Sequence, residues 1–186
     1  MAGHLPGMLL ARLRHDLHAL HFQMLGESSA RFHDSARDLE FTVEEQVEKH
    51  FLLRVVTARF IYRVPASAAG NRRLRLRHTG AWKRTGIDCT PPHAAFTADA
   101  DLARALLPLD FTHCELVQDA AGWQCRLTHY GASEVIGRFP PLRRYLRLPA
   151  PQLAALLDVF AALRANRALC ATPAAAPRHP PPASGR

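Results

Sequence analysis

HCELVQDAAGWQCRLT, residues 113–128, is the stretch of sequence that decides the fold. Each half alternates apolar and polar side chains, which is the period-two pattern of a strand with one buried face. A four-residue loop between the halves pairs Gln118 with Trp123. This register gathers apolar side chains on one face (Cys114, Leu116, Trp123, Cys125 and Leu127) and polar ones on the other (His113, Glu115, Gln124, Arg126 and Thr128). The stretch therefore predicts an antiparallel hairpin with buried thiols.

The same alternation, together with β-branched and aromatic residues, predicts further strands on both sides. Residues 52–64 are apolar on both faces, so this strand is predicted to be central in the sheet. Residues 44–49, just before it, are predicted as a bulge or a helical turn. The other extended segments are residues 30–33, 39–43, 73–77 and 82–89, and an edge strand made of 135–139 and 145–148 that Pro140-Pro141 interrupts.

Apolar residues at spacings of three and four predict three helices, over residues 5–25, over residues 97–107 and from Pro151 onward. The predicted fold is an α+β domain, an antiparallel sheet covered by helices in the order helix–strands–helix–strands–helix. The domain is expected to span residues 5–168. Residues 1–4 are expected to be a flexible N-terminus, and the Pro/Ala-rich residues 169–186 a disordered tail.

The chain is basic, with 24 Lys and Arg against 16 Asp and Glu and a net charge of +8. The basic residues concentrate in residues 51–92 and 138–186, and the acidic ones in residues 1–50 and 93–137. Two interpretations follow. Either the oppositely charged segments pair with each other in the fold, or the basic segments form one face that binds an anionic partner.

Two basic clusters are the candidate binding residues. Arginines in the strand over residues 73–77 project from one face, a tryptophan follows them, and a second cluster surrounds Tyr145. Guanidinium groups bind phosphates with two parallel hydrogen bonds, and a tryptophan stacks on bases. The alternative is a solvated or salt-bridged sheet face. The candidates are Arg73, Arg75, Arg77, Trp82, Lys83 and Arg84 in the first cluster, and Arg143, Arg144 and Arg147 in the second.

Metal and catalytic sites are not predicted. Cys125 and His129, in one strand, would lie about 13 Å apart at ~3.3 Å per residue, whereas zinc ligands lie about 2.3 Å from the metal. His15, His18 and His21 are expected on a solvated helix face. Ser133 follows a glycine but lacks the second glycine of a nucleophile elbow. We therefore expect no metal, no cofactor and no enzyme activity.

The sequence thus predicts a non-catalytic binding module that uses an Arg-rich face for an acidic protein surface or a nucleic acid. The alternatives are a small-ligand or lipid pocket between sheet and helices and, further, an enzyme of unknown reaction. No apolar stretch approaches the ~20 residues of a membrane span, and the first residues lack a signal sequence. A cytoplasmic protein is therefore expected, with no integral membrane segment. A homodimer through an edge strand is an open alternative.

Several local patterns resemble an uncharacterised proteobacterial family of unknown function, over about residues 8–165. They are Val47-x-x-His50-Phe51-Leu52, Thr79-Gly80-Ala81-Trp82-Lys83-Arg84, and Tyr130-Gly131-Ala132-Ser133 with Phe139-Pro140-Pro141 and Arg144-Tyr145. The resemblance implies a bacterial origin and a single domain, and it supplies no catalytic residues. The order of elements also resembles type III secretion chaperones, which bind polypeptides; those proteins are typically acidic, whereas this chain is basic.

Overall fold

The hairpin predicted from residues 113–128 is confirmed. In the computed structural model, β7 (Phe111–Asp119) and β8 (Gly122–Gly137) pair antiparallel, with Gln118 opposite Trp123 and Leu116 opposite Cys125. The five apolar residues predicted to face inward are all buried. The structure describes residues 5–65, 70–80, 83–97, 99–166 and 169.

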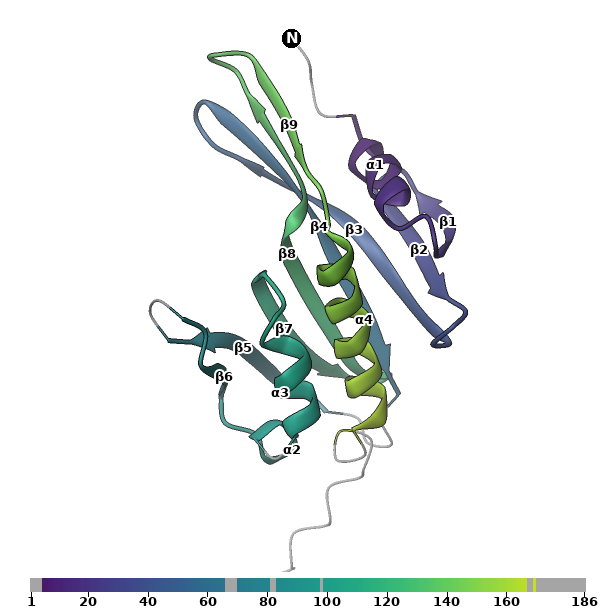
Figure 1. Ribbon diagram of the computed structural model, residues 1–186, viewed down its shortest axis with the longest axis vertical. Coiled ribbons are helices and arrows are strands. Elements are labelled where there is room, and N and C mark those ends of the chain that lie inside the picture. Colours follow the sequence, from purple (N-terminus) through teal and green to yellow (C-terminus); the bar gives the residue numbers. More distant parts are fainter. Residues whose placement is uncertain (1–4, 66–69, 81–82, 98, 167–168, 170–186) are drawn as a thin grey trace, which may run out of the picture.

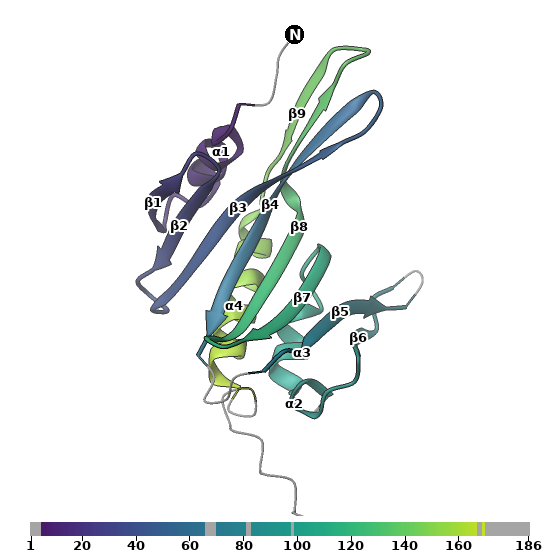
Figure 2. The ribbon, with the colours of Figure 1, turned by 180° about the vertical axis from the view of Figure 1, so that it is seen from behind.

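The described strands form one nine-stranded antiparallel sheet in the order β1-β2-β3-β4-β8-β7-β5-β6, with β9 also paired to β8 (Figures 1 and 2). The predicted central strand is confirmed, because β4 lies between β3 and β8. The remaining strands are β1 (His21–Gly26), β2 (Ser29–Asp34), β3 (Leu39–Lys49), β4 (Leu53–Val64), β5 (Arg73–Thr79), β6 (Gly86–Thr90) and β9 (Leu142–Leu146).

β8 pairs with two different strands along the same edge. Its first half pairs with β7, and its second half, from Ser133 onward, pairs with β9. Between the halves the register with β4 shifts after Thr57, and Ala132 has a φ of 52°. Such a bulge bends a strand and ends one pairing. The single interrupted edge strand predicted for residues 135–148 is therefore wrong: this segment is a β8–β9 hairpin.

The helices all lie on one face of the sheet (Figures 1 and 2). They are α1 (Met8–Asp16), α2 (Ala94–Thr97), α3 (Ala100–Leu106) and α4 (Ala150–Ala165). Asp99 caps α3 by accepting a hydrogen bond from the amide of Leu102 at 2.9 Å. The α+β class is confirmed, whereas the middle helical segment consists of two short helices instead of one.

The helix predicted over residues 5–25 is wrong in its second half, because α1 ends at Asp16 and β1 begins at His21. Leu20, Phe22 and Met24 also alternate with polar residues, so the segment fits a strand as well as a helix. Pairing of Phe22 with Phe32 of β2 decides between the two. The three histidines therefore do not share a helix, because His15 lies in α1, His18 follows its end and His21 begins β1.

α4 packs against the middle of the sheet, as its predicted apolar stripe requires. Phe160 is fully buried, and its ring lies 4.8 Å from that of Tyr62 and 5.3 Å from that of Phe41. Leu169, at the start of the predicted disordered tail, is also buried. The rest of that tail and residues 1–4 lie outside the described residues. Among the described helices, none is long and apolar enough to cross a membrane.

Candidate functional site

The three arginines of the first predicted cluster lie on β5, on the face of the sheet opposite the helices, whereas Lys83 and Arg84 lie between β5 and β6. Leu74 and Leu76 are buried, and the alternating Arg73, Arg75 and Arg77 are exposed. Arg73 Nε lies 3.5 Å from a carboxylate oxygen of Glu115, whereas the other two arginines form no ion pair within the described residues. Lys83 is exposed, Arg84 pairs with Asp110, and Trp82 lies outside the described residues.

Ion pairs cross this open face of the sheet. Glu115 also contacts Arg126 at 3.4 Å, and Arg63 lies 3.4 Å from Asp119. Asp88 stands opposite Arg77 in the β5–β6 register. Acidic side chains thus alternate with basic ones beside β5, so the open face is a mixed surface and not a uniformly basic one.

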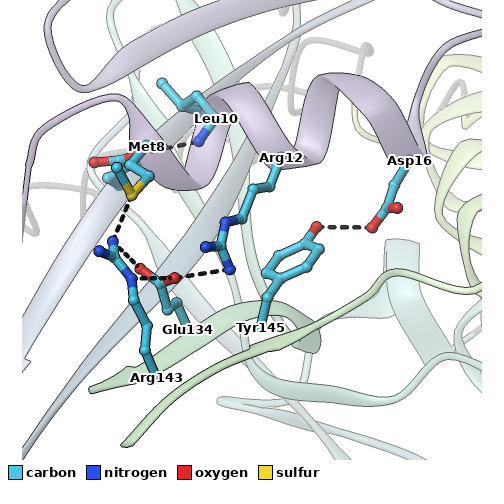
Figure 3. A network of polar contacts seen from close by, with 8 residues as sticks. Met8, Leu10, Arg12, Asp16, Glu134, Arg143 and Tyr145 are labelled. Atoms are coloured by element: carbon cyan, nitrogen blue, oxygen red, sulfur yellow. Dashed lines mark hydrogen bonds and ion pairs between the residues drawn. The ribbon is translucent and has the colours of Figure 1, made fainter.

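The second predicted cluster belongs to a network that holds α1 on the sheet (Figure 3). Both Arg143 Nε and one terminal nitrogen donate to the fully buried Glu134 at 2.9 Å, and Arg12 of α1 reaches the same carboxylate at 2.9 Å. The hydrogen bonds to Glu134 raise the pKa of Arg143. Arg144 is exposed and forms no ion pair among the described residues.

Both ends of α1 are held by carboxylates. Glu45 of β3 accepts hydrogen bonds from the amides of Gly7 and Leu10 at 3.0 and 3.1 Å. Asp16 accepts from the Tyr145 hydroxyl at 2.7 Å and from Arg147 Nε at 2.9 Å. Burial and the Asp16 contact raise the pKa of the Tyr145 hydroxyl. Arg147, like Arg143, is thus engaged within the fold.

The two predicted clusters do not merge into one surface. β5 lies at one end of the molecule, beyond β7, and β9 lies toward the other end (Figures 1 and 2). The interpretation in which oppositely charged segments pair within the fold is supported by Arg143–Glu134, Arg147–Asp16 and Arg73–Glu115.

Two hairpins project beyond α1 and lie side by side (Figures 1 and 2). One is the turn between β3 and β4, over residues 50–52, and the other is the turn between β8 and β9, over residues 138–141. The amide of Arg138 donates to the carbonyl of Leu52 at 2.9 Å, and Leu53 pairs with Gly137. We call these two turns the hairpin tips.

A row of mostly basic side chains crosses the sheet at the strand ends next to the hairpin tips. Lys49 of β3 pairs with Arg54 of β4, Arg54 pairs with Ile136 of β8, and Ile136 pairs with Arg143 of β9. Residues that are directly opposite in a sheet project to the same face, so Lys49 and Arg54 place like charges side by side. Residues 44–49 were predicted as a bulge or a helical turn, but they continue β3 as a regular strand and create this pair.

The basic row lines a cleft of about 800 Å³ between the hairpin tips, which we call the tip cleft. Its apolar lining includes Leu53, Ile136, Pro141 and Leu142; its basic lining is Lys49, His50, Arg54, Arg138 and Arg143, with no carboxylate among the described lining residues. Arg143 is already paired with Glu134, and His50 lies 3.8 Å from Glu48. Within the described residues, Lys49, Arg54 and Arg138 form no ion pair.

Large apolar side chains stand at the very ends of the hairpin tips. Phe51 is 90% exposed and Phe139 is 83% exposed, and Leu52 and Leu142 beside them are about half exposed. Scattered apolar residues are normal on a protein surface, whereas a contiguous group marks an interaction site. The tip cleft and its aromatic ends therefore form the strongest candidate site in the described part of the chain.

A second groove of about 850 Å³ lies between α3 and α4. It is lined by helix residues and their flanking turns, with Asp101, Arg104 and Asp158 among them, and no strand residue takes part. This groove therefore lies between two helices and is not the predicted alternative, a pocket between the sheet and the helices.

The Cys and His side chains that were considered as zinc ligands are buried in the core. Cys114 and Cys125 are buried, and the pKa of Cys114 is raised by its hydrogen bond to Cys125 and by burial. His129 Nδ1 accepts from the amide of Gly131 at 2.8 Å, and its Nε2 lies 2.7 Å from Gln152 Oε1. Within the described residues, no three His, Cys, Asp or Glu side chains are placed to hold a metal ion.

Residues 15–166 match the DUF3156 family, described as proteins of unknown function. The chain belongs to this family. The resemblance to an uncharacterised family is thereby confirmed, and the match spans the sheet and α2 to α4 but only the last two residues of α1. No curated protein and no solved structure matches the chain. For this member of DUF3156, function has to be argued from the arrangement of its residues.

Arg54→Thr is expected to stabilise the protein at low salt by about 0.5 kcal/mol, because like charges directly opposite in a sheet repel each other. Urea unfolding with and without about 0.5 M salt measures this gain, which salt should remove by screening. The matched control is Arg63→Thr on the same strand, which loses its contact with Asp119 and should gain nothing. A loss of stability in Arg54→Thr at low salt would show that Arg54 has a compensating partner.

Proposed function

We propose that this protein is a non-catalytic binding module and that the tip cleft holds its anionic partner. The observation that carries the proposal is the cluster of Lys49, Arg54 and Arg138, which line one cleft and form no ion pair within the described residues. Elsewhere, basic side chains such as Arg73, Arg126 and Arg147 have carboxylate neighbours.

The electrostatics of the tip cleft favour an anion. Arg54 is half-buried and directly opposite Lys49, so each charge raises the free energy of the other. A phosphate or carboxylate between them would remove this repulsion and accept charge-assisted hydrogen bonds from the guanidinium. A protein that retains such a repulsive pair gives up some stability, which is typical of functional sites.

The lining of the tip cleft also specifies an amphipathic partner. Ile136 lies on the same face of the sheet as Arg54 and Arg143, and Leu53, Pro141 and Leu142 are also among the residues that line the cleft. Ligand sites typically combine a mostly apolar wall with a few placed charges that fix orientation. A partner with an anionic group attached to an apolar body matches both parts of this lining.

A nucleic acid bound on β5 is the second candidate. Arg75 and Arg77 are exposed and have no ion pair among the described residues, so they remain available to phosphates. The neighbouring Glu115 and Asp88 weaken this candidate, because they place negative charge beside the path of a phosphate backbone.

Calorimetric titration with dodecyl phosphate, below its critical micelle concentration, tests the proposal. We expect binding that falls at least tenfold in Arg54→Gln/Arg138→Gln and is unchanged in the matched control Arg75→Gln/Arg77→Gln. The zwitterionic dodecylphosphocholine, with the same chain, should bind at least tenfold more weakly. Equal binding by wild type and Arg54→Gln/Arg138→Gln would overturn the proposal.

A labelled single-stranded oligonucleotide, titrated at several salt concentrations, tests the second candidate. Binding whose salt slope decreases in Arg75→Gln/Arg77→Gln, with no binding of dodecyl phosphate, would replace the tip cleft by β5 as the binding surface. An oligonucleotide that does not bind at low salt would exclude the second candidate.

A further inference from the structure

We propose that the anionic partner is the head group of a phospholipid within a bilayer, and that the hairpin tips insert Phe51 and Phe139 into that bilayer. This inference rests on the proposed function, because it names the partner of the same cleft.

The first argument is the position of the two aromatic rings. Phe51 and Phe139 are 90% and 83% exposed, and each lies in the turn of its own hairpin. The two turns project in the same direction, past the end of α1 (Figures 1 and 2). Side chains at the ends of two parallel projections reach a flat surface together, and a bilayer is such a surface.

The second argument is the order of apolar and basic side chains along each hairpin. Phe51 follows His50 and Lys49, and Phe139 follows Arg138 directly. An apolar end backed by basic residues is the arrangement of interfacial membrane-binding segments, whose apolar part enters roughly 5–10 Å beyond the head groups. Basic residues close to an anionic membrane each strengthen its binding by roughly fivefold.

The third argument is distance. Arg54 lies three residues beyond Phe51 along the chain, which is at most about 10 Å because the chain turns at residues 50–52. The head-group layer of one leaflet is roughly 5–8 Å thick. Aromatic rings at the boundary of the acyl chains would therefore bring Lys49, Arg54 and Arg138 level with the phosphates.

Charge complementarity distinguishes the bilayer from a second copy of the chain. Two copies that met through their hairpin tips would bring Lys49, Arg54 and Arg138 against the same residues of the other copy, and this repulsion opposes a dimer there. Glu48, which lies 3.8 Å from His50, is the exposed acid nearest in sequence to the tip of the first hairpin. An anionic membrane presents the opposite sign of charge over the whole area of both tips.

Flotation with vesicles tests the inference, using phosphatidylcholine alone and phosphatidylcholine with about 30% phosphatidylglycerol. We expect binding to the mixed vesicles at least tenfold stronger than to the neutral ones. Phe51→Ser/Phe139→Ser should reduce vesicle binding at least tenfold and leave dodecyl phosphate binding within about twofold. Arg54→Gln/Arg138→Gln should reduce both. The matched control is Tyr130→Ser, which removes an exposed aromatic ring away from the tips.

Insertion has a separate spectroscopic readout. Phe51→Trp should show a blue-shifted emission on the mixed vesicles and quenching by lipids brominated on their acyl chains, beyond the signal of the wild-type tryptophans. Thermal unfolding of the Phe51, Phe139 and Tyr130 variants should match wild type, because these side chains are largely exposed. Arg54→Gln/Arg138→Gln should unfold no earlier than wild type, because it removes the repulsion between Arg54 and Lys49.

The outcomes separate the two proposals. Binding of dodecyl phosphate without vesicle binding overturns the bilayer and leaves the anion site in place. Equal binding to neutral and anionic vesicles also overturns the inference, because the basic row would then have no role. Vesicle binding that survives in Phe51→Ser/Phe139→Ser excludes insertion by the hairpin tips. Failure of both ligands overturns the proposed function itself.

Discussion

Phe160→Ala is expected to lower the free energy of unfolding by about 4 kcal/mol, within the range for deleting a buried aromatic ring. Phe160 is fully buried, and its ring stacks on Tyr62 at 4.8 Å and contacts Phe41 at 5.3 Å. Its loss would leave a cavity between α4 and the centre of the sheet. Urea unfolding followed by circular dichroism measures the change.

The matched control on the same helix is Asp158→Ala. Asp158 is largely exposed and lies 3.6 Å from Arg37, so its removal should cost less than about 1 kcal/mol. If Phe160→Ala costs no more than this control, α4 is not packed against β3 and β4 as described. If the wild-type free energy of unfolding is below about 4 kcal/mol, Phe160→Ala will not fold, which agrees with the expected loss of stability.

The parts of the fold that the sequence predicts correctly are those with a local cause. The β7–β8 register follows from a short loop and alternating residues, so Leu116 and Cys125 could be paired without knowledge of the rest of the chain. The start of α4 near Pro151 is local for the same reason, because a proline suits the first turn of a helix.

The error at β1 has a non-local cause. Leu20, Phe22 and Met24 suit a strand, whereas Leu17, Leu20 and Met24 also continue the spacing of a helix. Pairing with β2 satisfies the backbone of this segment and places Phe22 at 5.2 Å from Phe32. Tertiary pairing overrides a local preference in such cases, because helix propensity amounts to only a fraction of a kcal/mol per residue.

The candidate site could not be predicted for a related reason. The row through Lys49, Arg54 and Arg143 exists only when three separate strand pairings have the correct register. Predicting a regular strand over residues 44–49, in place of a bulge or a helical turn, would have revealed the first pair of this row, Lys49 and Arg54. Arg143 was predicted as a binding residue from its basic neighbours in the sequence, but its buried partner Glu134 becomes a neighbour only through the β8–β9 hairpin.

Glu134→Gln is expected to lower the free energy of unfolding by about 3 kcal/mol, because it breaks a buried ion-pair network from one side. The carboxylate of Glu134 is fully buried and lies 2.9 Å from both Arg143 and Arg12. A glutamine keeps one acceptor oxygen but turns an amide donor toward two guanidinium groups. Urea unfolding measures the loss, and hydrogen exchange should show α1 protected less than β4.

A double substitution separates the cost of an unpaired charge from the cost of lost packing. Glu134→Leu/Arg143→Leu removes both main partners, and replacing a whole buried pair by apolar residues is often close to neutral. It should therefore be more stable than Glu134→Gln. The opposite order would show that the pair itself stabilises α1. If Glu134→Gln instead lowers the free energy of unfolding by less than about 1 kcal/mol, this network contributes no more than an ordinary exposed ion pair. Because Glu134 neutralises Arg143 at the rim of the tip cleft, Glu134→Gln should also bind dodecyl phosphate more tightly than wild type wherever it remains folded.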